Sequence, residues 1–251
     1  MGIYSHEPSS VYRSSLSSLH KRIDFQEFIT SALLEHRAVL EMALYRLSLE
    51  VTALTDAALL LVDTLRSGHK VLVAGNGGSA AEAQHFATEL VGRFKQERSA
   101  FAALALTADS ALLTAVANDY GYQDVFARQV EALGLADDVL LAFSTSGESE
   151  NLVRAALTGH LHGLHVIAIT GCKQSRLGDL ATITIRVPGS DTATAQELHM
   201  VLTHVLCEII ETQLTTYPTA NKEVAVKSMS GVTNLSLLTS HGNTEKEEEQ
   251  S

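Results

Sequence analysis

Residues 71–94 read VLVAGNGGSAAEAQHFATELVGRF, and this stretch decides the fold of the chain. A short apolar run comes first, a glycine-rich turn follows it, and the remainder has the pattern of a helix. Short apolar runs bounded by glycine are typical of buried strands, whereas longer periodic segments are typical of helices. A strand that passes through a glycine-rich loop directly into a helix is typical of α/β proteins with a parallel sheet.

The same alternation continues along the chain. Short apolar runs at 103–106, 139–143 and 166–169, and an alternating run at 182–187, predict four further strands. Helical patterns lie between these runs, and no hairpin signal joins consecutive strands. We therefore expect an α/β three-layer sandwich in which helices cover both faces of a mostly parallel five-stranded sheet. A last helix, rich in Leu, Val and Ile, is expected over about 194–213.

The N-terminal part of the chain has a different pattern. Apolar residues recur at three- and four-residue spacing from Asp24 to about Leu65, which predicts two long helices with a wide apolar face. Such a face must be covered by the domain itself or by another subunit. We expect one domain over 23–216 that includes these helices as a hairpin, a flexible leader at 1–22, and a disordered acidic tail at 217–251.

The composition excludes several classes of protein. The chain has 251 residues, with 18 Lys and Arg against 29 Asp and Glu, which gives a formal net charge of −11. An acidic chain without a basic block is a poor candidate for nucleic-acid binding, and no apolar run is long enough to span a membrane. The first residues do not resemble a secretory signal, and Cys172 and Cys207 are too few for a disulfide framework. We expect a cytoplasmic protein without nucleic-acid or membrane partners.

The glycine-rich loop Gly75-Asn76-Gly77-Gly78-Ser79 follows the first predicted strand, where α/β proteins bind ligands. Glycines let backbone N–H groups approach a ligand closely, and Ser79 can cap a helix whose N-terminus favours anions. The loop matches neither GxGxxG nor a Walker sequence, which argues against a dinucleotide or a nucleoside triphosphate. A tight turn without function is the alternative interpretation.

A second loop, Ser144-Thr145-Ser146-Gly147-Glu148-Ser149, follows the third predicted strand. Its hydroxyls and backbone amides at the start of a helix could bind one phosphate group without a lysine or an arginine. An ordinary Ser/Gly loop could look similar. Two such loops after strands of one sheet are, however, much less expected by chance.

Two helical segments carry candidate acid/base or metal-binding side chains. His85 and Glu89 stand four residues apart and therefore share one helix face, as a metal site or an acid/base pair requires. Gln196, His199 and His204 lie among apolar residues on the last predicted helix. The alternatives are an exposed His–Glu pair on the first helix and histidines buried in the core on the second.

With these residues in hand, the chain resembles the sugar isomerase (SIS) domain family, and within it the phosphoheptose isomerases. The resemblance rests on four segments in the same order: AGNGGSAAEAQHFATELVGRF, LTAVANDYGYQDVFARQVEALG, DVLLAFSTSGESENLV and TAQELHMVLTHVLCEIIE. They span roughly residues 70–212. One departure is Thr88, which stands where many relatives have an acidic residue before Glu89.

The resemblance implies a role for each matching residue. Glu89 and His204 would move protons, and zinc would be held by four side chains: His85, Glu89, Gln196 and His204. The sugar phosphate would be contacted by Asn76, Gly77, Gly78, Ser79, Glu89, Asn118, Asp119, Ser144, Thr145, Ser146, Ser149 and Gln196.

This set suits an aldose–ketose isomerisation. The resemblance implies that sedoheptulose 7-phosphate is converted to D-glycero-D-manno-heptose 7-phosphate through an enediol, as the first step of nucleotide-activated heptose synthesis. Zinc would act as a Lewis acid. The alternatives are a non-catalytic SIS adaptor, resembling the protein that binds the bacterial replication initiator, and an isomerase of another phosphosugar. Adaptor relatives lack the histidine on the last helix, so His204 favours the enzyme.

The spacing on the last helix bears on assembly. Gln196 and His204 are eight residues apart, which is about 12 Å along a regular helix. Either the helix is irregular there or the site draws on more than one subunit. The resemblance implies a homotetramer with sites at subunit interfaces.

Overall fold

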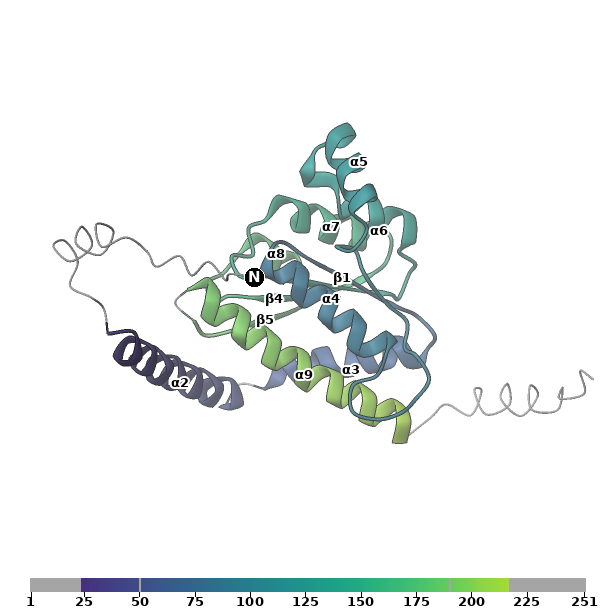
Figure 1. Ribbon diagram of the computed structural model, residues 1–251. Coiled ribbons are helices and arrows are strands. Elements are labelled where there is room, and N and C mark those ends of the chain that lie inside the picture. The colour runs from purple at the N-terminus through teal and green to yellow at the C-terminus, as the bar shows by residue number, and fades with distance from the viewer. Residues whose placement is uncertain (1–23, 50, 190, 217–251) are drawn as a thin grey trace, which may run out of the picture.

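The computed structural model describes residues 24–49, 51–189 and 191–216 (Figure 1). The predicted leader at 1–22 and the predicted acidic tail at 217–251 lie outside these described residues. The elements of the described chain are, in order, α2 (Phe25–Leu49), α3 (Thr52–Arg66), β1 (Val71–Gly75), α4 (Gly78–Val91), β2 (Ala103–Ala105), α5 (Ser110–Tyr120), the 3₁₀ turn η1 (Tyr122–Asp124), α6 (Ala127–Leu133), β3 (Val139–Ser144), α7 (Glu150–Leu161), β4 (His165–Thr170), α8 (Arg176–Leu180), β5 (Ile183–Arg186) and α9 (Thr192–Thr216).

The strands of the described chain form one five-stranded sheet in the order β2-β1-β3-β4-β5, and every neighbouring pair is parallel. The predicted α/β fold is therefore confirmed. Every residue of β1 and β3 is buried, as expected for central strands that are covered by helices on both faces. The register pairs Gly75 with Phe143 and Ser144 with Thr170. The loops after β1, β3 and β4 therefore leave the sheet at one edge.

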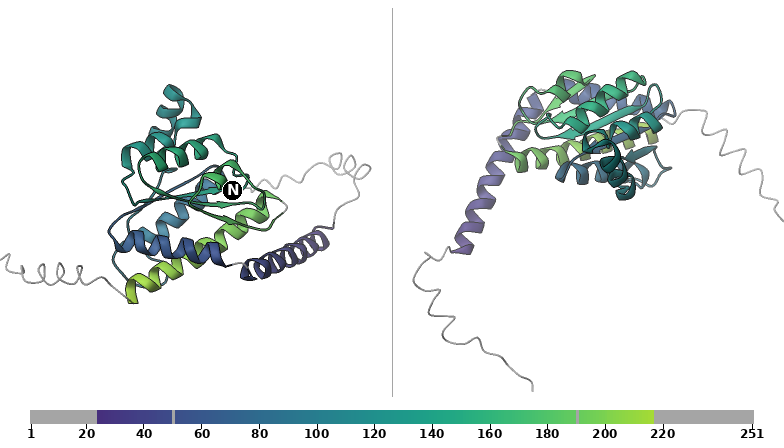
Figure 2. Two further views of the ribbon diagram at one scale, coloured as in Figure 1. Left: turned by 180° about the vertical axis from the view of Figure 1, so that it is seen from behind. Right: turned by 90° about the horizontal axis from the view of Figure 1, so that it is seen from above.

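The helices form one layer on each face of the sheet (Figure 2). On one face, α3, α4 and α9 pack against strand side chains such as Val73 and Leu141. On the other face, α5, α6, α7 and α8 pack against Leu72 and Leu140. Neighbouring residues belong to different cores because successive side chains of a strand point to opposite faces. All the predicted histidine residues lie in the layer that contains α4 and α9.

The N-terminal helices differ from the predicted hairpin. Both predicted helices are present, but α2 contacts α9 and runs outward from the body instead of folding back along α3 (Figures 1 and 2). Ala43 is buried, whereas Phe25 and Leu33 are 74% and 67% exposed. The apolar periodicity of α2 therefore reflects a face that the described part of this chain does not cover.

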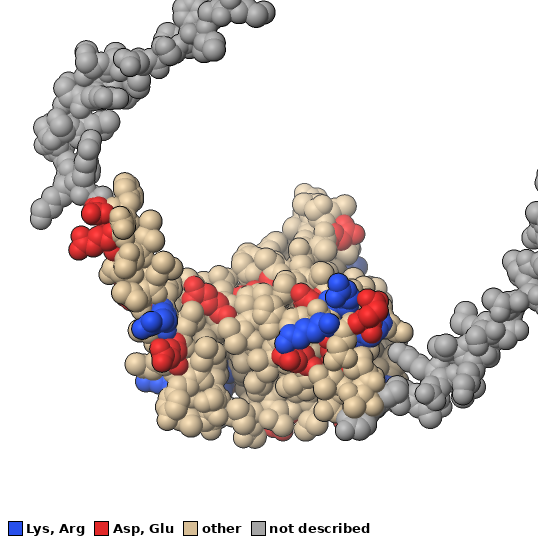
Figure 3. Space-filling model, turned by 60° about the horizontal axis from the view of Figure 1, so that its bottom comes forward, with Lys and Arg blue, Asp and Glu red and all other residues tan. Residues whose placement is uncertain are grey.

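The surface agrees with the acidic, mixed composition. In Figure 3 much of α2 and of the neighbouring face consists of uncharged residues, with basic and acidic side chains interspersed. Among the described residues, no helix combines the length and the apolar character needed to cross a membrane.

Candidate active site

The loop after β1 turns the chain sharply from the sheet into α4. Gly77 precedes the helix with a φ of +56°, a left-handed conformation that favours glycine. A side chain on Gly75 would collide with the backbone of Ser79, so the close approach also requires glycine there. Ser79 is buried, and its N–H donates to the Asn76 carbonyl at 3.0 Å. The predicted Ser79 cap is wrong, because α4 begins at Gly78 and Gly77 takes the cap position.

Asn76 joins this loop to the loop after β3. Its side-chain amide exchanges two hydrogen bonds with Asn151 in the first turn of α7, at 2.9 and 2.8 Å. The Tyr122 hydroxyl donates a third bond to Asn76 Oδ1 at 3.1 Å. Neither Asn151 nor Tyr122 was predicted as a site residue, because a pair 75 residues apart leaves no local pattern in the sequence. These bonds hold the two predicted ligand loops against each other.

The loop Ser144–Ser149, the serine loop, is ordered by its own hydroxyls. Ser144 Oγ accepts from the Gly147 N–H at 3.0 Å, and Ser146 Oγ accepts from the Glu148 N–H at 3.2 Å. Gly147 has a φ of +67°, and a side chain there would collide with the Ser175 hydroxyl. Ser149 occupies the cap position of α7, so the loop ends at a helix N-terminus that favours anions.

A hollow lies beside the serine loop at the carboxyl edge of the sheet. Thr145 and Ser146 line it on one side, and Lys173 and the start of α9 line it on another. Hydroxyls, one lysine and the N-terminus of α9 are groups that can bind an anion such as a phosphate monoester, although the carboxylates of Glu148 and Asp191 also line the hollow. In the first turn of α7, hydrogen bonds from Arg176 and Arg154 lower the pKa of the Glu150 carboxyl group. We call this hollow the serine groove.

A second hollow lies between α4 and α9 and is called the histidine groove. Its lining residues are Gly78, Ala81, Glu82, His85, Ala193, Gln196, Glu197 and Met200. The Gln196 amide lies against the Cα atom of Gly78, so closely that a side chain at Gly78 would collide with it. The two grooves therefore flank the first turns of α9.

Three contacts follow one another in the same order along α4 and α9, so the two helices pack side by side and are parallel. The Gln196 side chain contacts Gly78, and His199 Nδ1 lies 3.3 Å from Glu82 Oε2. Farther along, the His204 ring contacts the His85 ring. α9 is one continuous α-helix from Thr192 to Thr216. The alternative of an irregular helix between Gln196 and His204 is thereby wrong.

His85, Glu89 and His204 form the histidine cluster. The Nε2 atoms of His85 and His204 are 3.0 Å apart, and His85 Nε2 lies 3.4 Å from Glu89 Oε1. The ring of Phe94 stacks on the His204 ring at a centroid distance of 5.7 Å. The side chains of His85 and Glu89 are 37% and 19% exposed, so a ligand can reach them. His85 and Glu89 are therefore more than an exposed ion pair on one helix.

His199, in contrast, is a histidine of the hydrophobic core. It is fully buried, pairs with the buried Glu82, and packs its ring against Phe143. The core interpretation therefore holds for His199 and fails for His204.

The chemistry of the histidine cluster fits a zinc ion. Two nitrogens bound to one tetrahedral zinc at about 2.0–2.1 Å lie about 3.3 Å apart, close to the observed separation of the two imidazoles. A carboxylate from Glu89 is a usual third donor. Within the described residues, however, no three His, Cys, Asp or Glu side chains close around one point. Gln196 lies two turns before His204, at the other end of the groove.

The remaining predicted residues lie apart from this cluster. Asn118 and Asp119 are exposed on α5 and hydrogen-bond to each other, from Nδ2 to Oδ1 at 2.8 Å. His85 lies seven residues into α4, about 10 Å from the glycine loop. A single chain thus brings the glycine loop and the serine loop together near the start of α4. It brings His85 and His204 together farther along the same helix.

Comparisons with known proteins show which family the chain belongs to. Residues 37–171 match the SIS domain family. The phosphoheptose isomerase of a Bradyrhizobium strain is 46% identical over 189 residues, which cover 74% of this chain and 96% of that protein. The phosphoheptose isomerase of Thiobacillus denitrificans is 50% identical over 162 residues, 63% of this chain and 82% of that protein.

A solved structure extends the similarity to three dimensions. The phosphoheptose isomerase of Neisseria gonorrhoeae superposes with a TM-score of 0.68 at 39% sequence identity, covering 75% of this chain and 99% of that one. The sequence match, the relatives and the shared architecture agree, and the chain belongs to the SIS domain family.

Proposed function

We propose that this protein is a phosphoheptose isomerase, which converts sedoheptulose 7-phosphate to D-glycero-D-manno-heptose 7-phosphate for nucleotide-activated heptose synthesis. The observation that carries the proposal is the meeting of His85 and Glu89 on α4 with His204 on α9. Relatives that carry the name phosphoheptose isomerase support the choice of substrate.

The histidine cluster supplies the groups that the isomerisation needs. Glu89, as a carboxylate, takes the proton from C1 of the ketose, and the electron pair of that C–H bond forms the enediol. The same proton returns at C2 to give the aldose. His204 moves the second proton between the two oxygens, which suits an imidazole near neutral pH. His85, Glu89, Gln196 and His204 would hold a zinc ion, which would supply Lewis-acid polarisation of the carbonyl.

The phosphate group of the substrate is assigned to the serine loop. Thr145 and Ser146 line the serine groove, and Ser149 stands at the start of α7. A phosphate group bound at the serine loop orients the carbon backbone of the sugar, and this positioning contributes to the reaction rate. Asn76, Gly77 and Gly78 then contact the sugar between the two ends.

We further propose that the enzyme is a homotetramer whose sites lie between subunits. The exposed apolar side chains of α2 support a partner, because a contiguous apolar helix face is normally buried. Gln196 lies two helical turns from His204, and Asn118 lies on α5 in the other helix layer, which also supports completion by a second subunit. Free thiols at Cys172 and Cys207 are consistent with a reducing, cytoplasmic setting.

One experiment tests the proposed reaction. Purified protein is incubated with sedoheptulose 7-phosphate, and the aldose is followed by NMR, with other ketose and aldose phosphates tested in parallel. We expect turnover of the heptose phosphate. Turnover of a hexose or pentose phosphate alone would favour another isomerase, and turnover of none by zinc-loaded protein would favour the adaptor.

A further inference from the structure

The C-terminal end of α4 is capped by a side chain that lies outside the helix. The last carbonyls of a helix have no partners within the helix and carry a partial negative charge. Arg98 Nη2 donates to the Glu89 carbonyl at 2.7 Å, and Nη1 donates to the Leu90 carbonyl at 2.9 Å. The Arg98 side chain is only 4% exposed. The guanidinium therefore holds the last turn of α4, on which Glu89 stands.

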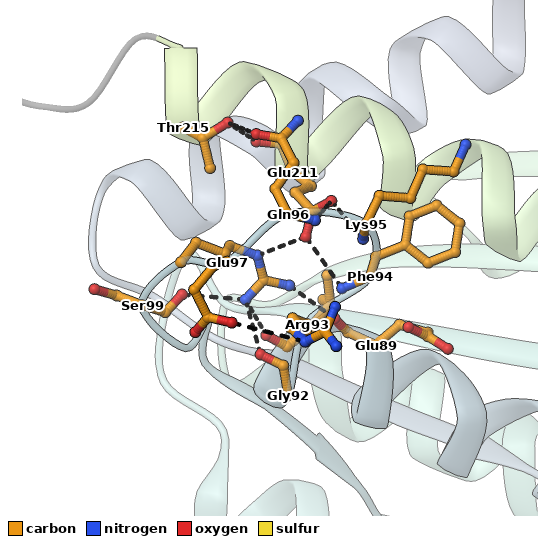
Figure 4. A network of polar contacts seen from close by, with 12 residues as sticks. Glu89, Gly92, Arg93, Phe94, Lys95, Gln96, Glu97, Ser99, Glu211 and Thr215 are labelled. Carbon is orange, nitrogen blue, oxygen red and sulfur yellow. Dashed lines mark hydrogen bonds and ion pairs between the residues drawn. The ribbon is translucent and has the colours of Figure 1, made fainter.

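Glu211 on α9 accepts from the same arginine and from the loop that carries it. Arg98 Nε donates to Glu211 Oε1 at 3.1 Å. The N–H groups of Phe94, Lys95 and Gln96 donate to the two carboxylate oxygens at 3.1, 2.8 and 2.9 Å (Figure 4). Burial alone would raise the pKa of Glu211, but these three amides and the Arg98 charge outweigh it and lower the pKa.

The loop between Arg98 and α4 ends at the histidine cluster. Phe94 donates its N–H to Glu211 and stacks its ring on His204. Glu211 follows His204 by seven residues, which is two helical turns and so the same face of α9. Arg98 and Glu211 thus fix the backbone of Glu89 on one helix and the ring neighbour of His204 on the other.

We propose that the buried Arg98–Glu211 pair is a positioning pair that sets the spacing of Glu89 and His204 for proton transfer. The inference rests on the function proposed above. Neither residue touches the substrate. The pair acts through the end of α4 and through Phe94. It joins α4 to α9, two helices that are separated by 100 residues of sequence.

The test compares two variants of the pair with a matched control. Glu211→Gln removes the charge of the carboxylate. Arg98→Lys keeps the positive charge but loses the planar guanidinium that donates to Glu211 and to four backbone carbonyls together. If Glu211→Gln does not fold, the Arg98→Lys variant alone tests the proposal. The control is Asp138→Asn, because Asp138 is also buried and accepts from two backbone amides and from Lys70. Those bonds join the residues before β1 and β3 and do not involve α4 or α9.

Three readouts separate positioning from general stability. The first is kcat and KM, measured on protein that is folded by circular dichroism. The second is the His204 ring-proton resonance in histidine-labelled protein, assigned by its loss in His204→Asn. The third is protection of the buried Cys207 thiol from thiol reagents in a Cys172→Ser background. Burial raises the pKa of Cys207 to about 12, so the thiol reacts only when the packing opens.

We expect both pair variants to lower kcat about 10- to 100-fold, because a displacement near 1 Å has effects of that size. KM should change by less than about threefold, since the serine loop is untouched, and the His204 resonance should move while Cys207 stays protected. Asp138→Asn should lose stability but keep kcat and the resonance. Unchanged kcat and resonance in the pair variants, or an equal loss of kcat in Asp138→Asn, would overturn the positioning role. If wild-type protein does not turn over the sugar, the proposed function fails, and the resonance alone decides the positioning role.

Discussion

His85 and His204 place their Nε2 atoms 3.0 Å apart although 119 residues separate them in the chain. Two imidazole nitrogens at this separation need a shared proton or a shared metal ion. The parallel packing of α4 and α9 brings them together, and the same packing brings Gln196 to Gly78. The proposed proton transfer therefore depends on the packing of this helix pair, while the proposed phosphate site lies at the carboxyl edge of the sheet.

The first prediction concerns the base. Glu89→Gln keeps the shape of the side chain and the Arg98 bond, which goes to the backbone carbonyl. The fold should be preserved while turnover falls by at least about 10²- to 10⁴-fold, the usual contribution of a general base. Turnover of sedoheptulose 7-phosphate measures the effect. Near-wild-type activity would remove Glu89 from the mechanism.

The second prediction separates the enzyme from an adaptor. His204→Asn removes the ring that meets His85 and stacks on Phe94. Zinc affinity should drop about 10- to 100-fold or more, and isomerisation should fall with it. Native mass should be unchanged, because the apolar face of α2 is untouched. An active, zinc-loaded His204→Asn protein would favour the adaptor.

The third prediction tests the phosphate loop. Ser146→Ala removes a hydroxyl that lines the serine groove and accepts a hydrogen bond from the Glu148 N–H. Each lost hydrogen bond to a charged group is worth about 1.5–3 kcal/mol, so KM should rise roughly 10- to 150-fold with a smaller change in kcat. Thermal stability without ligand should stay almost the same. A sharp fall in stability with an unchanged KM would make the loop structural.

The fourth prediction uses two glycines with positive φ. Gly147→Ala must place a methyl group on the Ser175 hydroxyl, whereas Gly68→Ala at a φ of +88° meets nothing within 4 Å. Both variants incur backbone strain of about 1–2 kcal/mol, but only Gly147→Ala should distort the serine loop. We expect KM to rise in Gly147→Ala alone, measured beside thermal unfolding of both proteins. Equal KM values would mean that the loop tolerates the displacement.

The sequence predicts those features that leave a local pattern. Strands β1 and β3 are continuous apolar runs because both faces are buried, and His85 and Glu89 show their shared helix face in a four-residue spacing. The meeting of His85 with His204 is implied only by resemblance to a family, since packing between distant helices has no signature within either segment. The Asn76–Asn151 and Arg98–Glu211 pairs were not predicted for the same reason.

The N-terminal helices show a second limit. Apolar periodicity correctly predicts a helix in this region, and it predicts that one face of the helix is apolar and must be buried. The same periodicity does not say whether the cover lies in the same chain or in another subunit, and both were predicted as alternatives. The exposed side chains of Phe25 and Leu33 show that the cover does not lie within the described chain.

The last prediction follows from the lowered pKa of Glu211. A carboxyl group whose pKa is lower in the folded protein stabilises the fold above its ordinary pKa of 4.5, and the stabilisation is lost as the pH falls through the folded value. At pH 7, Glu211→Gln should lower the free energy of unfolding by about 3–5 kcal/mol, because it leaves the buried Arg98 without its charged partner. The difference between wild type and variant should shrink steadily below about pH 4.5.

Urea unfolding at fixed protein concentration, at pH 7, 5, 4 and 3.5, measures this difference. The control is Glu208→Gln, one turn earlier on α9, whose ion pair with Lys95 is more than half exposed and should contribute about 0–1 kcal/mol at each pH. A wild-type advantage over Glu211→Gln that stays constant down to pH 3.5 would show that the charge of Glu211 does not stabilise the fold. No wild-type advantage at any pH would show that the three amides and Arg98 need only an oxygen acceptor at this position, which the glutamine side chain also provides.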